Sequence, residues 1–172
     1  MTSSVDSRGA PVVTAEVLRL AMAQFATGVT VVTSRDRDGE PVGTTANAVT
    51  SLSLDPPLVL VCLNRTSLTL QALRGHGAFA VNVLAEGQRE LCASFARRGS
   101  DGAWAGVRQR DCSTATPGLS DALATLDCSV DRIYPGGDHE IVIGRVVEVH
   151  IDEEEAPLLF HRGAYARLQK LP

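Results

Sequence analysis

Gly43-Thr44-Thr45-Ala46-Asn47-Ala48-Val49-Thr50-Ser51-Leu52-Ser53-Leu54-Asp55-Pro56-Pro57 is the most informative segment of this sequence. Between positions 44 and 53 it has three threonines, two serines and one asparagine. Strands are normally stabilised by β-branched and aromatic side chains, and Gly or Asn weakens them. The hydroxyls and main-chain groups would suit a flat, polar-edged ligand that carries a phosphate. Taken alone, the segment is explained slightly better as a Ser/Thr-rich edge strand that ends in a proline turn.

The length and composition predict one globular domain. The chain has 172 residues, of which 44% are hydrophobic and 21% charged, and this is enough to bury a core without cross-links. Aromatic residues make up only 4%, so the core must consist of Val, Leu, Ile and Ala. A net charge of −4 argues against a general nucleic-acid-binding surface. We expect a flexible N-terminus over residues 1–13 and one domain over residues 14–172.

The cysteines and the apolar runs indicate a cytoplasmic protein. Cys62, Cys92, Cys112 and Cys128 are widely spaced and form neither a CxxC pair nor a zinc-binding Cys–His spacing. They are predicted to be buried free thiols, which fits a reducing compartment. Residues 1–13 lack the apolar core of a signal peptide, and no apolar run is long enough to span a bilayer.

Strands outnumber helices in the predicted element order. The first helix is expected to begin after the cap Thr14, to have an apolar face that includes Val17, Ala21 and Phe25, and to stop at Gly28. Two further helices are expected at 67–73 and 86–98. The strands are expected at 29–34, along the polar segment, at 58–63 with both faces covered, and at 78–84, 126–134 and 139–151. Asp38-Gly39 predicts a hairpin turn, and 99–118 a long loop. This order predicts a mainly β fold with flanking helices, a Greek-key-like antiparallel barrel rather than a doubly wound parallel sheet.

Several common catalytic motifs are missing from the sequence. It has no GxGxxG after a strand, no P-loop and no Gly-x-Ser-x-Gly, which removes support for Rossmann, Walker-type and α/β-hydrolase functions. The acidic run Asp152-Glu153-Glu154-Glu155 is interpreted as a solvated turn.

Three residues have both a structural and a functional explanation. His139 follows Gly136-Gly137-Asp138, where it could donate a hydrogen bond or titrate, or could be a turn histidine without a task. Ser67 lies at a predicted helix N-terminus, where it could bind phosphate, although simple capping is the favoured explanation. Arg98, near a helix C-terminus, is more typical of a solvated cation.

Taken together, the ordered segments resemble the flavin reductase-like family, the small reductase components of two-component flavin-dependent monooxygenases. The resemblance covers nearly the whole chain except the first ~20 residues and the 99–118 loop, the kind of ends and loops that vary most freely. It rests on Phe25–Thr33, Thr44–Val61, Phe79–Leu84, Phe95-Ala96, Gly137-Asp138-His139, Pro157–Phe160, Gly163 and Tyr165.

The resemblance implies a split β-barrel homodimer that binds FMN or FAD and reduces it with NADH or NADPH. It places the isoalloxazine along the polar segment, phosphate near Ser67 and at the helix end that includes Ser94, and the nicotinamide at His139. The implied cofactor-binding residues are Thr44, Thr45, Ala46, Asn47, Ala48, Val49, Thr50, Ser51, Ser53, Cys62, Leu63, Ser67, Ser94, Phe95, Ala96, Arg97, Arg98, His139, Gly163 and Tyr165, with His139 as the implied catalytic residue. No metal is implied, and the implied partner is a monooxygenase that receives reduced flavin.

Hydride transfer between two bound rings requires stacking and orientation more than an acid–base pair, which fits the absence of one here. A flavin-binding module or sensor on the same barrel, without turnover, is the competing interpretation. A pyridoxal-phosphate oxidase-like enzyme uses a similar barrel, but its basic phosphate-binding cluster is not seen in this sequence.

Overall fold

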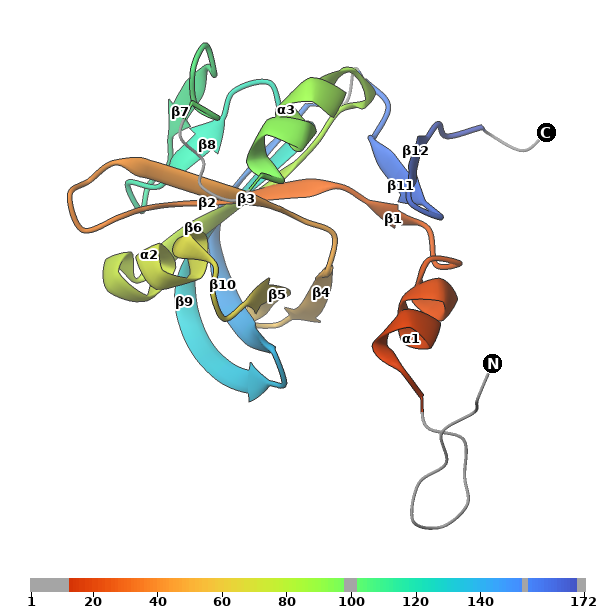
Figure 1. Ribbon diagram of the computed structural model, residues 1–172. Coiled ribbons are helices and arrows are strands. Elements are labelled where there is room, and N and C mark those ends of the chain that lie inside the picture. The colour runs from red at the N-terminus through yellow and green to blue at the C-terminus, as the bar shows by residue number, and fades with distance from the viewer. Residues whose placement is uncertain (1–12, 98–101, 153–154, 170–172) are drawn as a thin grey trace.

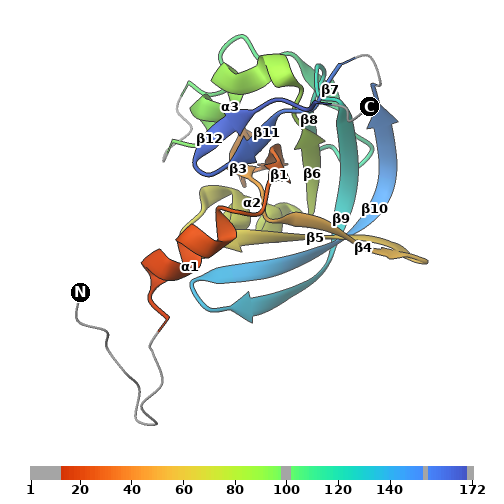
Figure 2. The same ribbon diagram turned by 90° about the vertical axis from the view of Figure 1, so that its right-hand side faces the viewer.

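A computed structural model describes residues 13–97, 102–152 and 155–169, and Figures 1 and 2 show it in two views at right angles. Its main feature is one antiparallel sheet in which seven strands follow the order β3-β2-β6-β9-β10-β5-β4. These strands are β2 (Thr30–Arg35), β3 (Pro41–Ala46), β4 (Val49–Leu54), β5 (Pro57–Asn64), β6 (Ala78–Val83), β9 (Ala124–Gly136) and β10 (His139–Ile151).

The two edges of this sheet are formed by consecutive strands. Only Asn47 and Ala48 separate β3 from β4, so the sheet curls until its two edges meet at this turn. The expected mainly β fold with flanking helices is confirmed. Closure into a barrel is not made by hydrogen bonds within the described strands, because β3 and β4 do not pair. The polar segment, expected as one strand, therefore forms two strands at opposite edges.

The strand β5 corrects another expectation. Its side chains alternate, with Val59, Val61 and Leu63 buried and the intervening Leu58, Leu60 and Cys62 half-buried. The consecutive apolar residues predicted a strand covered on both faces. Within residues 13–97, 102–152 and 155–169, the core covers one face of β5, and the other face is partly open.

Two helices pack on opposite sides of the β2–β3 hairpin (Figure 1). The helix α2 (Leu68–His76) begins at the cap Ser67 and ends at Gly77, whose φ of 79° is in the left-handed region. It places Leu70 and Leu73 in the core inside the sheet. On the other side, a 3-10 turn at Glu86–Gln88 leads into α3 (Arg89–Phe95), a shorter helix than the expected 86–98.

Gly43 is required for the close approach of α3 to β3. A Cβ atom at this position would lie 2.8 Å from Cε1 of Phe95, which is itself only 1% exposed. Phe95 packs edge-on against Trp104, with ring centroids 5.0 Å apart. The glycine at the start of the polar segment therefore allows α3 to lie directly on it.

The helix α1 (Ala15–Met22) lies apart from the body of the molecule (Figures 1 and 2). It begins at the predicted cap Thr14, but it ends well before Gly28 and none of its residues is buried. The expected apolar face is exposed, with Val17 at 54% and Phe25, beyond the helix, at 68%.

The 99–118 segment is more ordered than the long loop expected from sequence. Its described part contains the hairpin of β7 (Gln109–Asp111) and β8 (Pro117–Leu119). The buried carboxylate of Asp127 accepts hydrogen bonds from Ser113 Oγ (2.9 Å), Thr114 N (2.9 Å) and Thr116 Oγ1 (3.0 Å), which anchors the hairpin to β9. Residues 99–101, like the predicted N-terminal segment up to residue 12 and Glu153-Glu154, lie outside the described residues.

A second sheet joins the two ends of the described chain in the order β1-β11-β12. It consists of β1 (Thr27–Gly28), β11 (Leu159–His161) and β12 (Ala164–Ala166). All four cysteines are free, and Cys92, Cys112 and Cys128 are buried as expected, while Cys62 is half-buried. Among the described residues, no helix has the length and apolar character needed to cross a lipid bilayer.

Candidate functional site

Two adjoining cavities meet at Asn47, in the turn between β3 and β4. The smaller, of about 220 Å³, is lined by Val29, Thr45, Ala46, Asn47, Cys92, Ala96, Phe160 and Tyr165. The larger, of about 470 Å³, is lined by Phe25, Ala26, Thr27, Gly28, Thr30, Asn47, Val49, Thr50, Ser51, Val81, Val83 and Leu126. Because Asn47 belongs to both, we treat them as one site and call it the Asn47 site.

The polar segment enters this site at the point where its backbone leaves one sheet edge for the other. Thr45 Oγ1 donates to the Cys92 carbonyl (2.8 Å), and Thr30 Oγ1 donates to the Ala46 carbonyl (2.6 Å). These bonds fix the backbone on both sides of the turn. Among the described residues, the side chain of the exposed Asn47 makes a single 3.4 Å contact, from its Nδ2 to Thr27 Oγ1, so most of its hydrogen-bonding capacity is available to a ligand.

Tyr165 forms the opposite wall of the smaller cavity. Its hydroxyl donates to the Cys92 Sγ (3.2 Å), and its ring meets Phe160 edge-on at 5.8 Å. The hydrogen bond to Cys92, then desolvation, raises the pKa of Tyr165 above its ordinary value. The side chain of Tyr165 is thus held by its hydroxyl and by the edge of its ring.

The site combines planar apolar walls with main-chain groups and hydroxyls. Val29, Val49, Phe160 and Tyr165 supply the apolar surface, and the 45–51 backbone supplies the polar edge. Sites for flat organic cofactors have this composition, a mostly apolar lining with a few placed polar groups. Among the described residues, the linings of the two cavities include no carboxylate, histidine, lysine or arginine, which suits a site that orients ligands rather than one that transfers protons.

Comparison with known proteins identifies the family. The family model described as "Flavin reductase like domain" matches residues 22–169. The chain belongs to the flavin reductase-like family. It is 43% identical over 151 residues to the flavin-dependent monooxygenase reductase subunit HsaB of Rhodococcus jostii, covering 88% of this chain and 76% of that protein. It is 41% identical over 153 residues to the 4-hydroxyphenylacetate 3-monooxygenase reductase component of Thermus thermophilus, covering 89% and 96%.

The fold agrees with the family as well. The NADH:FAD oxidoreductase SgcE6 of Streptomyces globisporus, solved in complex with NAD and FAD fragments, superposes with a TM-score of 0.84. The two chains are 35% identical, and the match covers 98% of each.

Eight of the residues implied by the flavin reductase resemblance line the Asn47 site. They are Thr45, Ala46, Asn47, Val49, Thr50, Ser51, Ala96 and Tyr165. From the sequence we did not identify Cys92, Phe160 or residues 25–30 as residues that line the site. Cys92 could have been found from its spacing, because residues i and i+4 lie on the same face of a helix and Ala96 follows it by four.

Three of the implied residues lie on the outer face of the sheet, beside the site. The amide of Cys62 donates to the Ala48 carbonyl (2.9 Å), and Cys62 pairs with Ile141 across β5 and β10. His139 lies two residues before Ile141 on β10 and on the same face. From strand spacing and rise, it lies about 12 Å from Ala48.

His139 itself interacts mainly with its neighbour. Its Nδ1 lies 2.8 Å from Asp138 Oδ1, and this hydrogen bond together with the imidazole charge lowers the pKa of the Asp138 carboxyl. His139 is half-buried and does not line the Asn47 site. Gly163, with a φ of 79°, forms the β11–β12 turn two residues before Tyr165.

Other implied residues have structural roles. The Ser67 hydroxyl accepts from Leu70 N (3.4 Å), so it caps α2 as the favoured explanation predicted. Phe95 and Leu63 are core residues, at 1% and 3% exposure. Thr44 and Ser53 are half-buried strand residues, Arg97 is exposed, and Arg98 lies outside the described residues.

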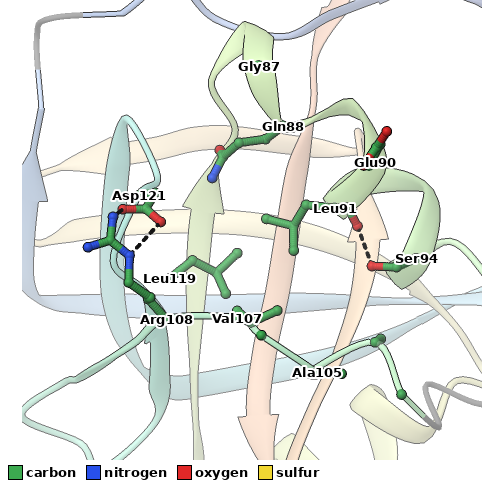
Figure 3. A pocket seen from close by; sticks show the side chains of 13 residues that line it. Gly87, Gln88, Glu90, Leu91, Ser94, Ala105, Val107, Arg108, Leu119 and Asp121 are labelled. Atoms are coloured by element: carbon green, nitrogen blue, oxygen red, sulfur yellow. Dashed lines mark hydrogen bonds and ion pairs between the residues drawn. The ribbon is translucent and has the colours of Figure 1, made fainter.

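Ser94 faces a different cavity, on the other side of α3 (Figure 3). This cavity measures about 380 Å³ and lies between Gln88, Leu91 and Ser94 on one side and Val107 and the Arg108–Asp121 ion pair on the other. The Ser94 hydroxyl donates to the Leu91 carbonyl (2.8 Å). The helix α3 therefore separates Ser94 from the Asn47 site, although Ala96 is on that site's side.

Proposed function

We propose that this protein is an NAD(P)H-dependent flavin reductase that binds FMN or FAD at the Asn47 site. One observation carries the proposal: six of the seven residues from Thr45 to Ser51 line the two adjoining cavities. A polar segment that is only an edge strand is not expected to line a cavity on both sides of its turn. Membership of the family supports the same activity.

The residues present fit such a cofactor. Bound flavin supplies the hydride-accepting ring, and the nicotinamide supplies the hydride. The apolar walls would exclude water from the faces of a bound ring, while the 45–51 backbone and the Asn47 side chain would provide polar groups for its edge. Tyr165 and Ala96 limit the position of a ligand on the other side.

We propose that His139 orients the nicotinamide. It lies on the same outer face as Ala48 and Cys62, where an imidazole could hydrogen-bond a carboxamide. Asp138 holds Nδ1 in place and so leaves Nε2 directed away from the turn. The distance of about 12 Å between His139 and Ala48 leaves room for two stacked rings between them. It is too long for both residues to contact the flavin ring directly.

We also propose that the sheet closes as a split barrel and that two copies form a dimer. The two sheet edges are consecutive strands, which supports closure around the core. The apolar residues of α1, with Leu20 at 63% and Met22 at 58% exposure, are left uncovered by the described part of the chain, and the outer face of β5 is half open. Sedimentation at micromolar concentration should give a dimer, whereas an active monomer would contradict this assembly.

The reduced flavin is proposed to leave for a separate monooxygenase in the cytoplasm. The Asn47 site is bordered by exposed residues, which would let a reduced cofactor exchange. Free thiols at all four cysteines fit a reducing compartment. The competing function is a flavin-binding module or sensor that holds the cofactor without turnover.

A direct assay separates these two functions. Purified protein is mixed with each flavin and each nicotinamide dinucleotide, and oxidation of the dinucleotide is followed at its absorbance band. The reductase hypothesis predicts flavin-dependent oxidation above the uncatalysed rate with at least one pair. Flavin binding without such oxidation would assign the protein to the binding module instead.

A further inference from the structure

Arg89 lies against the wall of the Asn47 site. It is the first residue of α3, and its Cζ lies 5.0 Å from the ring centroid of Tyr165. Arg89, Cys92 and Ala96 are spaced by three and four residues, so they share one face of the helix. Cys92, Ala96 and Tyr165 all line the smaller cavity, which places the Arg89 guanidinium at its border.

The position of the Arg89 guanidinium over the Tyr165 ring leaves its hydrogen-bond donors available. Contact with an aromatic face uses the plane of the group and leaves its N–H groups pointing outward from the edge. Among the described residues, no carboxylate lies within ion-pair distance of Arg89. A planar fork of donors without an acidic partner in the described part of the chain matches the oxygens of a phosphate, which it can bind through two parallel hydrogen bonds.

The neighbouring charges favour an anion at this place. Arg167 is paired with Glu86, one turn before Arg89, and Arg162 is bonded to the neutral amide of Gln24. Glu90, the next residue, faces the cavity on the other side of α3. The unpaired charge near Arg89 is therefore positive, although the net charge of the chain is −4. Electrostatic attraction of an anion is thus confined to this border of the Asn47 site.

We infer that Arg89 is a specificity-determining residue that binds a phosphate group of a cofactor held in the Asn47 site, with Tyr165 as its platform. The inference rests on the proposed function. Two sources offer the same chemistry: the ribityl phosphate of the flavin and the 2′-phosphate of NADPH. The resemblance implied phosphate near Ser67 and at the helix end that includes Ser94; in the structure Ser67 caps α2, and Ser94 faces the cavity on the other side of α3.

The test compares cofactors with and without the phosphate. Binding of FMN and riboflavin is measured by fluorescence titration for the wild type, Arg89→Gln and Arg89→Lys, and the dissociation constants of NADPH and NADH are measured by titration in the same way. Arg37→Gln, at the exposed β2–β3 turn, removes the same charge away from the site and serves as the matched control. Thermal unfolding of each variant shows whether the fold is retained.

We expect Arg89→Gln to weaken one phosphate-bearing cofactor by about tenfold or more and its phosphate-free counterpart by less than about twofold. A loss confined to FMN identifies the ribityl phosphate, and a loss confined to NADPH identifies the 2′-phosphate. Arg89→Lys should recover only part of the affinity, because an ammonium neither stacks nor binds through two bonds.

Equal losses for both members of each pair would show that Arg89 only supports Tyr165, and unchanged affinities would show no role at all. Either result overturns the inference. The titrations do not need turnover, so their outcome is independent of whether the wild type reduces flavin.

Discussion

Replacing Gly43 by alanine tests how closely the fold and the Asn47 site are connected. The new Cβ would lie 2.8 and 3.0 Å from two ring carbons of Phe95 and 3.3 Å from Thr33 Cγ2. Carbon atoms in contact prefer about 3.5–4.0 Å, so α3 must move outward by roughly 0.7 Å. Phe95 cannot turn aside, because it is buried against Trp104.

The cost follows from these contacts. Overpacking of a buried site costs about 1–3 kcal/mol. The displacement also lengthens the hydrogen bond from Thr45 Oγ1 to the Cys92 carbonyl, which adds about 1 kcal/mol. We expect the free energy of unfolding to fall by about 2–4 kcal/mol, equivalent to a melting temperature lower by about 5–15 °C. Flavin affinity should fall too, because Cys92 and Ala96 move with the helix.

Denaturant unfolding measures the loss, and the double variant Gly43→Ala/Phe95→Leu identifies its cause. Leucine removes the ring carbons that the new methyl group meets, so the two substitutions should cost less together than the sum of their separate effects. Strictly additive free energies would refute the argument that Gly43 is needed for the approach of Phe95.

Three further variants probe other parts of the molecule. Gly144→Ala places a Cβ 2.4 Å from Phe79 Cζ, so it should destabilise the fold by about 3 kcal/mol or more in urea unfolding while any folded fraction binds flavin normally. Burial raises the pKa of Cys128 from its ordinary value of 9.0 to about 12. The unfolded thiol therefore ionises first, and the free energy of unfolding should fall as the pH rises from about 9 towards 12, with a smaller fall in Cys128→Ala. His139→Ala should raise the Michaelis constant for NADH with little change in flavin affinity, unlike His150→Ala; a joint loss of both affinities would show a structural role for His139.

Much of the fold follows from local sequence signals. The cap Thr14, the cap Ser67 and the Asp38-Gly39 turn are all found where their short-range chemistry predicts. Such signals act within a few residues, so one sequence is enough to find them. The boundaries were less accurate, because α1 ends at Met22 where no glycine stops it.

Properties that depend on long-range packing were not predictable in the same way. The polar segment forms two strands at opposite edges because the sheet curls around its core, and no local pattern encodes that curl. The consecutive apolar residues of β5 predicted two covered faces, but one face is half exposed within a single chain. Cys92 contributes to the site because of where α3 lies. That position depends on residue 43 being a glycine, which has no Cβ atom.

The central claim is that the turn between β3 and β4 binds the flavin, and titration of flavin fluorescence tests it most directly. Wild type, Asn47→Ala and Ser51→Ala are compared with Asn64→Ala, an exposed asparagine at the C-terminal end of β5 that does not line the site. The account predicts that Asn47→Ala or Ser51→Ala weakens flavin binding by about 1–3 kcal/mol, with unchanged thermal unfolding. Unchanged flavin affinity in both variants would contradict it and leave residues 44–53 as no more than a polar sheet edge.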